Sequence, residues 1–143
     1  MAGSNNNSRL SDLEMIEKKK DIDEKFQNNY VDKANEVISK LNGKIITKTK
    51  LRSIYNMLCN AIDREKRSTE SDLKSDSLTE LKMFRVHVIY DCGRYEDVKN
   101  FVIKSGILGY YADIGNSKVK FQYFCKYFEA LIAYHRFLYN NKD

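Results

Sequence analysis

The residue types that most often carry out catalysis are scarce in this sequence and do not form a catalytic pattern. Its only two histidines, His87 and His135, lie inside apolar helical patterns, away from any nucleophile in a predicted loop. The carboxylate pair Glu96-Asp97 is explained by the preference of acidic residues for a helix N-terminus. No phosphate-binding glycine loop of the G-x-x-x-x-G-K-[ST] or G-x-G-x-x-G type is present. We therefore predict no catalytic residues and no enzymatic activity.

Metal and disulfide chemistry is equally unsupported by the sequence. The three cysteines, Cys59, Cys92 and Cys125, are widely spaced, and no C-x-x-C, H-x-x-x-H or H-E-x-x-H pattern occurs. A zinc site needs three or four ligands at defined spacing, and a disulfide framework needs paired cysteines. All three cysteines lie beside apolar residues, so we expect buried free thiols and neither a metal nor a cofactor.

The chemistry that the sequence does offer is positive charge, concentrated in one segment. The chain of 143 residues has 25 Lys and Arg against 20 Asp and Glu, a formal net charge of +5. Residues 1–46 are neutral overall, whereas residues 47–67 carry a net charge of +4. Lysine and arginine that neutralise phosphates supply most of the sequence-independent affinity for nucleic acids. The block predicts a polyanionic partner, although a solvated helix face would have the same composition.

Helices are expected to position these charges, because the sequence has no proline and its apolar residues recur every three or four positions. The spacing predicts helices over residues 26–41 and about 51–62, the second capped by Thr47 or Thr49. Residues 78–92 alternate partly like a strand, but their length favours a buried helix that ends at Gly93. A short helix follows at 95–105, and glycines interrupt the apolar residues 107–114.

The last predicted helix begins after Asn116 or Ser117 and has one wide aromatic-rich face from Phe121 to Tyr139. We expect this face to pack in the core rather than to stack on bases, because aromatic side chains dominate core burial. The sequence therefore predicts an all-α fold, a compact single-domain bundle of about five helices. Residues 1–24 are expected to form a poorly ordered or loosely attached leader, and residues 25–143 the folded domain.

Three stretches of the sequence resemble a known family. They are TKTKLRSIYNML (47–58), RVHVIYDCGRYEDVKNFV (85–102) and NSKVKFQYFCKYFEALIAYHRFL (116–138). In this order and spacing they are similar to the small subunit of type III-A CRISPR effector (Csm) complexes. That family has a Thr-initiated L-R-x-x-Y helix, a Y-x-x-G-R turn followed by V-K-x-F, and an aromatic closing helix. The similarity covers about residues 25–139 and excludes the leader.

The resemblance implies a small, all-helical, non-catalytic protein that works inside a ribonucleoprotein. In this family several copies stack along a crRNA-bearing filament of backbone subunits and touch the large subunit at one end. They hold target RNA by its backbone, while base pairing to the guide supplies specificity. The partners implied for residues 25–143 are crRNA, target RNA, other copies of the chain, and the backbone and large subunits.

Ten basic residues are the resulting candidates for RNA contact. Lys48, Lys50 and Arg52 come first, because they begin a predicted helix, where free N–H groups and the helix dipole also attract phosphate. Arg64 and Arg67 equally suit a role as solvated cations at a helix C-terminus. Arg85 interrupts an apolar run, so it is expected to pair with a carboxylate or a phosphate. The full set is Lys48, Lys50, Arg52, Arg64, Arg67, Arg85, Arg94, Lys120, Lys126 and Arg136.

No apolar run has the length of a signal peptide or a membrane span, so we expect a cytoplasmic protein with no membrane contact. Two other functions fit part of these observations. One is a helical protein–protein module that does not touch nucleic acid and turns its basic block toward acidic partners. The other is the equivalent small subunit of a type III-B complex. An RNA-processing enzyme would need an acid–base or metal set that the sequence lacks.

Overall fold

The part of the chain that the structure describes contains helices and no strands. A computed structural model describes residues 2–140, and the side chains of residues 9–140. The helices are α1 (Ala2–Ile16), α2 (Glu24–Ser39), α3 (Lys48–Asn56), α4 (Cys59–Lys66), α5 (Ser75–Arg94), α6 (Glu96–Ser105), α7 (Ile107–Ile114) and α8 (Lys118–Leu138). The all-α prediction is confirmed. The predicted number of about five is wrong, since residues 2–140 form eight helices. None of these helices combines the length and apolar character needed to cross a membrane.

Two of the additional helices arise from breaks that the apolar pattern does not reveal. The predicted second helix divides into α3 and α4 at Met57 and Leu58, whose amides bond to carbonyls three positions back. Both residues keep right-handed helical dihedral angles, so the buried stripe from Leu51 to Ala61 continues through the break. Gly106 adopts a left-handed conformation, with φ of 70°, and this ends α6. Residues 107–114 therefore form a separate helix, α7.

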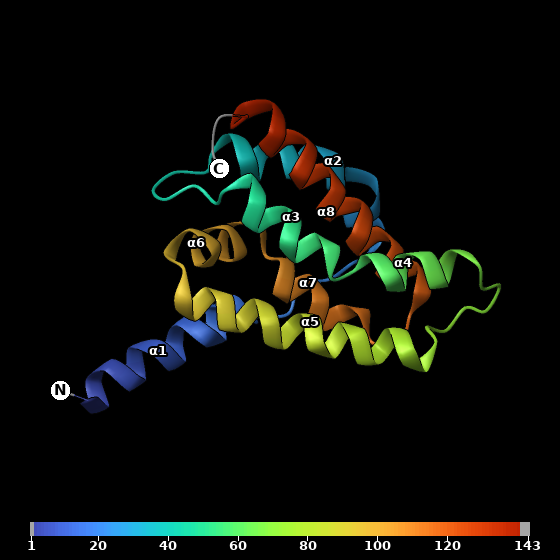
Figure 1. Ribbon diagram of the computed structural model, residues 1–143, viewed down its shortest axis with the longest axis horizontal. Coiled ribbons are helices and arrows are strands. Elements are labelled where there is room, and N and C mark those ends of the chain that lie inside the picture. Colours follow the sequence, from blue (N-terminus) through green and yellow to red (C-terminus); the bar gives the residue numbers. More distant parts are fainter. Residues whose placement is uncertain (1, 141–143) are drawn as a thin grey trace.

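The segment predicted to be a poorly ordered leader contains helix α1. Figure 1 shows α1 projecting from the bundle with the N-terminus at its outer end. Near its inner end Ile16 is buried, as is Ile22, and Lys99 Nζ lies 2.6 Å from Asp12 Oδ2. Met1, the side chains of residues 2–8 and residues 141–143 lie outside the described part. The division into a leader and a domain at residue 25 stays a prediction.

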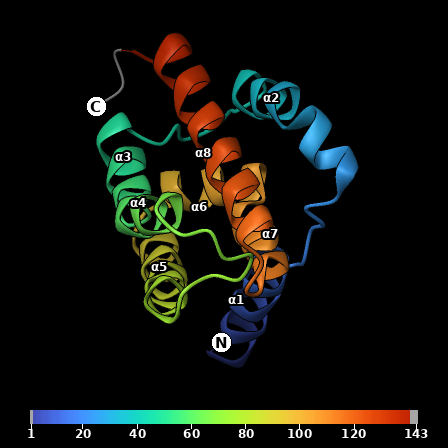
Figure 2. The same cartoon turned by 90° about the vertical axis from the view of Figure 1, so that its right-hand side faces the viewer.

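Helix α8 lies at the centre of the bundle. Figure 2 shows it with α2 on one side and α3 and α4 on the other, and it also contacts α7. Its predicted aromatic face is buried, with Phe121, Phe124 and Phe128 at most 1% exposed. Edge-to-face contacts join other helices to this face; the Phe84 and Phe124 ring centroids, for example, are 6.0 Å apart. The prediction that this face is core is confirmed from Phe121 to His135, but it is wrong for Leu138, which is 45% exposed.

Residues 78–92, which alternate partly like a strand, lie in helix α5, and this helix extends beyond its predicted end. Leu81, Phe84 and Val88 are buried at helical spacing. The prediction that Gly93 ends this helix is wrong, because α5 continues to Arg94 and ends where Tyr95 adopts extended dihedral angles, φ −125° and ψ 120°. The resembling Y-x-x-G-R stretch is therefore the last turn of a helix, which places its residues on a shared helical surface.

Candidate nucleic-acid interface

Helix α3 directs the first three candidate cations to two different sides. Thr47 caps the helix as predicted, because its Oγ1 accepts a hydrogen bond from the amide of Lys50 at 3.2 Å. Leu51 is buried in the core, so the positions that flank it face outward. Lys48 and Arg52, one turn apart, border one hollow, whereas Lys50 borders a different one.

A basic hollow lies between α3 and the C-terminal part of α8. It has a volume of about 390 Å³, and none of its described lining residues is acidic. Lys48 Nζ donates a hydrogen bond to the backbone oxygen of Asn140 at 3.4 Å, which joins α3 to the chain after α8. The hollow combines three cations with other, shorter side chains that can form hydrogen bonds. Both kinds of group suit the oxygens of a phosphate backbone. The residues that line the basic hollow are Lys48, Thr49, Arg52, Ser53, Asn56 and Arg136.

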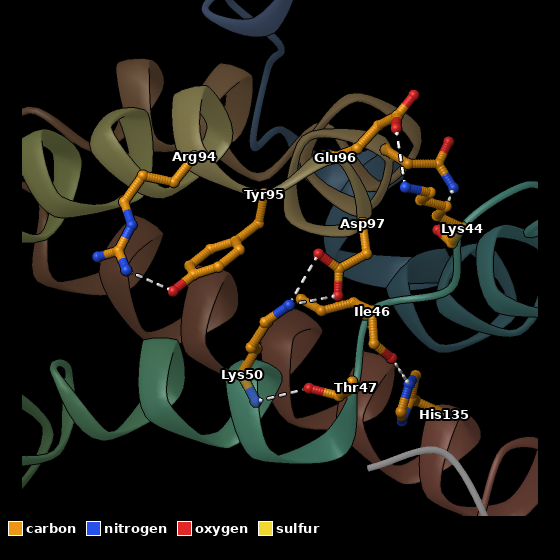
Figure 3. Close-up of polar contacts among 10 residues, drawn as sticks. Lys44, Ile46, Thr47, Lys50, Arg94, Tyr95, Glu96, Asp97 and His135 are labelled. Carbon is orange, nitrogen blue, oxygen red and sulfur yellow. Dashed lines mark hydrogen bonds and ion pairs between the residues drawn. The ribbon is translucent and has the colours of Figure 1, made fainter.

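Lys50 is held in an ion pair between two helices. Its Nζ lies 3.1 Å from both carboxylate oxygens of Asp97, in the first turn of α6, and 4.1 Å from the centre of the Tyr95 ring. Figure 3 shows Lys50 reaching from α3 toward this carboxylate. The Asp97 side chain is only 12% exposed. A phosphate that drew Lys50 away would leave a nearly buried carboxylate without its cation.

Arg64 and Arg85 also have carboxylate partners within the chain. Arg64 donates two hydrogen bonds to Glu80, at 2.7 and 3.0 Å, which raise the pKa of Arg64 and lower that of Glu80. The Arg85 Nε donates to Glu17 at 2.6 Å, and this bond raises the pKa of Arg85. Arg85 is therefore paired, as expected, and its partner in this structure is a carboxylate. Both cations connect α5 to neighbouring segments.

Lys120 and Arg67 differ in the surroundings of their charge. Lys120 Nζ lies 3.1 Å from Asp113, which also pairs with Lys19 at 3.3 Å and accepts from the Ile22 amide at 2.8 Å. Burial alone would raise the pKa of Asp113, but these hydrogen bonds outweigh it and lower that pKa. Arg67, at the C-terminal cap of α4, is exposed. Lys120 therefore belongs to a network of ion pairs. Arg67 is exposed to solvent and does not line the basic hollow.

Arg94 and Lys126 lie against aromatic rings. Arg94 Cζ is 5.3 Å from the centre of the Tyr90 ring and 4.7 Å from that of Tyr95. Lys126 Nζ is 4.7 Å from the centre of the Tyr123 ring. Both basic side chains are exposed. A ring attracts a cation without neutralising it, so these charges remain available to an anion.

The described side chains contain no group of three or more His, Cys, Asp or Glu that could hold a metal ion. The expectation of buried free thiols is met by Cys92 and Cys125, whereas Cys59 is only partly buried. Burial raises the pKa of Cys92 to about 12 and also raises that of Cys125. Such thiols stay protonated at neutral pH and are poor nucleophiles.

Three of the ten candidates, Lys48, Arg52 and Arg136, thus come together in the basic hollow, and the other seven lie outside it. The sequence prediction missed the part played by Tyr90 and Tyr95, which flank the guanidinium of Arg94. Tyrosines four residues before and one residue after an arginine are the pattern that could have revealed them, since the first pair shares a helix face.

Comparison with known proteins identifies the family. A family model described as Csm2 Type III-A matches residues 23–141. The "CRISPR system Cms protein Csm2" of Mycobacterium tuberculosis is 34% identical over 117 residues, which cover 79% of this chain and 94% of that protein. The protein of the same name from Streptococcus thermophilus is 33% identical over 120 residues, or 80% of this chain and 94% of its own. The matched family is type III-A rather than type III-B. The three sequence stretches, the all-α fold and these similarities agree, and the chain belongs to the Csm2 type III-A family.

Proposed function

We propose that this chain is a non-catalytic small subunit of a type III-A CRISPR ribonucleoprotein and that it binds the backbone of target RNA without reading its sequence. Its partners in this proposal are crRNA, target RNA, other copies of itself, and the backbone and large subunits. Several copies stack along the crRNA filament in the cytoplasm and serve antiviral defence. Membership of the Csm2 type III-A family supports the subunit assignment.

The observation that carries RNA binding is the basic hollow. Lys48, Arg52 and Arg136 come from two helices and share a concave surface whose described lining has no carboxylate. Helix α3 is capped by Thr47 and anchored by the buried Leu51 and Ile54, so the backbone that carries two of these cations is already ordered before binding. Phosphates offer the same charge at every nucleotide, which makes the expected contact independent of sequence.

The test is target-RNA binding by the assembled type III-A complex, carrying Arg52→Ala together with Arg136→Ala, at several salt concentrations. Each lost phosphate contact should reduce the dependence of log affinity on log salt concentration by roughly one unit. Lys104→Ala is the matched control, because it removes an exposed cation from α6 outside the hollow. Unchanged affinity and unchanged salt dependence in the double variant would contradict the proposal.

The same variants separate RNA binding from the alternative of a protein–protein module. If the basic hollow binds an acidic partner subunit, less of the double variant should join the complex. The fraction of complex that still contains the variant should then bind RNA normally. If it binds RNA, the complex should assemble with normal composition and bind RNA more weakly. Subunit composition after size-exclusion chromatography distinguishes the two outcomes.

A further inference from the structure

The last turn of α5 combines an exposed ring, a bare stretch of backbone and a cation on one face. Tyr90, Gly93 and Arg94 are three and four residues apart, so they are neighbours on the helix surface. Tyr90 is 60% exposed, and Arg94 is exposed as well. This group is separate from the basic hollow between α3 and α8 and has no role in the backbone contact proposed above.

The packing of the fold does not explain the glycine. A Cβ atom at Gly93 would meet no described atom within 4 Å, and its backbone is not in the positive-φ region that favours glycine. Glycine inside a helix lowers helix stability relative to alanine. Glycine at such a position instead allows a ligand to approach the backbone closely, here directly beside the ring of Tyr90 and the guanidinium of Arg94.

An alternating series of cations and rings fixes the geometry of this surface. Lys50 Nζ lies 4.1 Å from the centre of the Tyr95 ring, and Arg94 lies between the rings of Tyr95 and Tyr90. Arg94 also donates a hydrogen bond to the Tyr95 hydroxyl at 2.6 Å, as Figure 3 shows. The series is anchored at its inner end by the ion pair of Lys50 with Asp97. Its outer end is the exposed Tyr90 ring.

Among the described side chains, Arg94 is the cation of this series that has no counter-ion. Asp97 pairs with Lys50, and the neighbouring Glu96 lies 3.2 Å from Lys44 Nζ. Within residues 9–140, no carboxylate is at ion-pair distance from Arg94, whose contacts are with the two tyrosines. The surface therefore offers an aromatic ring beside an available guanidinium, which complements a flat apolar group that carries a phosphate.

We propose that Tyr90, Gly93 and Arg94 form a stacking site for one unpaired nucleobase of RNA. The base lies on the Tyr90 ring and over the Gly93 backbone, and Arg94 contacts the adjoining phosphate. Every base has an aromatic face, so the site accepts any of the four and does not read sequence. This inference rests on the proposed RNA-binding function and adds a second, chemically different contact to it.

The test compares a single-stranded oligoadenylate with inorganic polyphosphate, which has the charge but no bases, as ligands of the full chain at low salt. Tyr90→Leu keeps an exposed apolar side chain and removes the ring, so RNA affinity should fall roughly five- to a hundredfold while polyphosphate affinity stays unchanged. Tyr90→Phe should bind RNA like the wild type. Gly93→Ala should weaken RNA binding although its melting temperature is equal to or above that of the wild type.

Arg52→Ala separates this inference from the proposed function. It should weaken binding of both RNA and polyphosphate, because it removes a phosphate contact. If Arg52→Ala weakens binding and both Tyr90→Leu and Gly93→Ala do not, the stacking site is overturned and the proposed function stands. If Tyr90→Leu weakens RNA binding alone and Arg52→Ala has no effect, the stacking site stands and the basic hollow is wrong.

Exposed apolar residues farther along α5 provide the remaining control. Met83 and Val86 are 60% and 61% exposed and extend the surface away from Arg94. Val86→Ala should leave RNA affinity unchanged. If Tyr90→Leu and Val86→Ala instead prevent the chain from joining the type III-A complex and leave RNA affinity intact, the face binds a protein and the stacking site is overturned. A wild-type chain that binds oligoadenylate no more tightly than polyphosphate also overturns it.

Discussion

Replacing Lys50 by alanine is expected to destabilise the fold while leaving the salt dependence of RNA binding unchanged. Lys50 was one of three equivalent candidates in the sequence, but its Nζ donates two hydrogen bonds of 3.1 Å to Asp97. Removing one partner of a fully buried ion pair costs about 3–5 kcal/mol, because the other charge stays behind in a poorly solvated place. Asp97 is close to this situation, since its side chain is 12% exposed.

Two features of the structure reduce that cost. The Lys50 side chain is 34% exposed, so water screens the pair and rehydrates Asp97 after the substitution. Asp97 also lies in the first turn of α6, where the helix dipole favours a negative charge. We therefore expect about 1–2 kcal/mol from the ion pair, and the lost contact of the ammonium with the Tyr95 ring adds about 0.5–1 kcal/mol. The total is about 2 kcal/mol.

Urea unfolding of the full chain measures the lost free energy of unfolding. The salt dependence of RNA binding by the assembled complex tests whether Lys50 contacts phosphate. For a domain of this size, 2 kcal/mol corresponds to a melting temperature lower by roughly 5–8 °C. Lys50→Met keeps most of the length of the side chain without its charge, so it should lose the ion-pair part of the stability as Lys50→Ala does. Arg52→Ala should behave in the opposite way, with normal stability and weaker RNA binding. A Lys50→Ala protein with wild-type stability and a reduced salt dependence would refute the assignment of Lys50 to the fold.

Two further predictions concern the packing of the N-terminal segment and a buried histidine. Gly109→Ala should destabilise the chain by about 1–3 kcal/mol in urea unfolding, because its Cβ would overlap the backbone oxygen of Lys18; Gly93→Ala, in open space, is the control and should not destabilise. His135 is buried, which lowers its pKa although its hydrogen bond with the Ile46 carbonyl opposes the shift. The unfolded chain then binds the proton more readily, so stability should fall as the pH drops through about 6.5 toward the lowered pKa. His135→Gln should lose this part of the pH dependence of unfolding, and an unchanged pH profile in that variant would contradict it.

Local features of the fold were predictable from the sequence because the information lies within a few residues. Thr47 can cap α3 because its hydroxyl reaches an amide three positions along the chain. The aromatic face of α8 repeats with helical spacing, which predicts its burial. The predicted end of α5 was wrong because it also relied on a local signal, namely that glycine is common at helix ends. The helix continues past Gly93 and ends after Arg94, where Tyr95 becomes extended.

The candidate site was less predictable because its composition depends on pairs far apart in the sequence. Lys50 and Asp97 are separated by 47 residues, and neither helix pattern indicates that they meet. Arg136 joins the basic hollow only because the C-terminal part of α8 lies beside α3. Charge counting treats Lys50, Arg64 and Arg52 alike, whereas the fold gives carboxylate partners to the first two.

These pairings change what the +4 charge of residues 47–67 means for RNA binding. Lys50 and Arg64 each form an ion pair with a carboxylate of another helix. A phosphate that bound either cation instead would have to offset the free-energy cost of leaving that carboxylate without its partner. Within residues 9–140 neither Arg52 nor Arg136 has a carboxylate partner at ion-pair distance, and the fold places both in one hollow although they lie far apart in the sequence. In the proposed function, the charge that binds RNA is therefore smaller than the segment total and comes from two segments. The salt dependence of binding should accordingly follow the residues of the basic hollow rather than the net charge of the block.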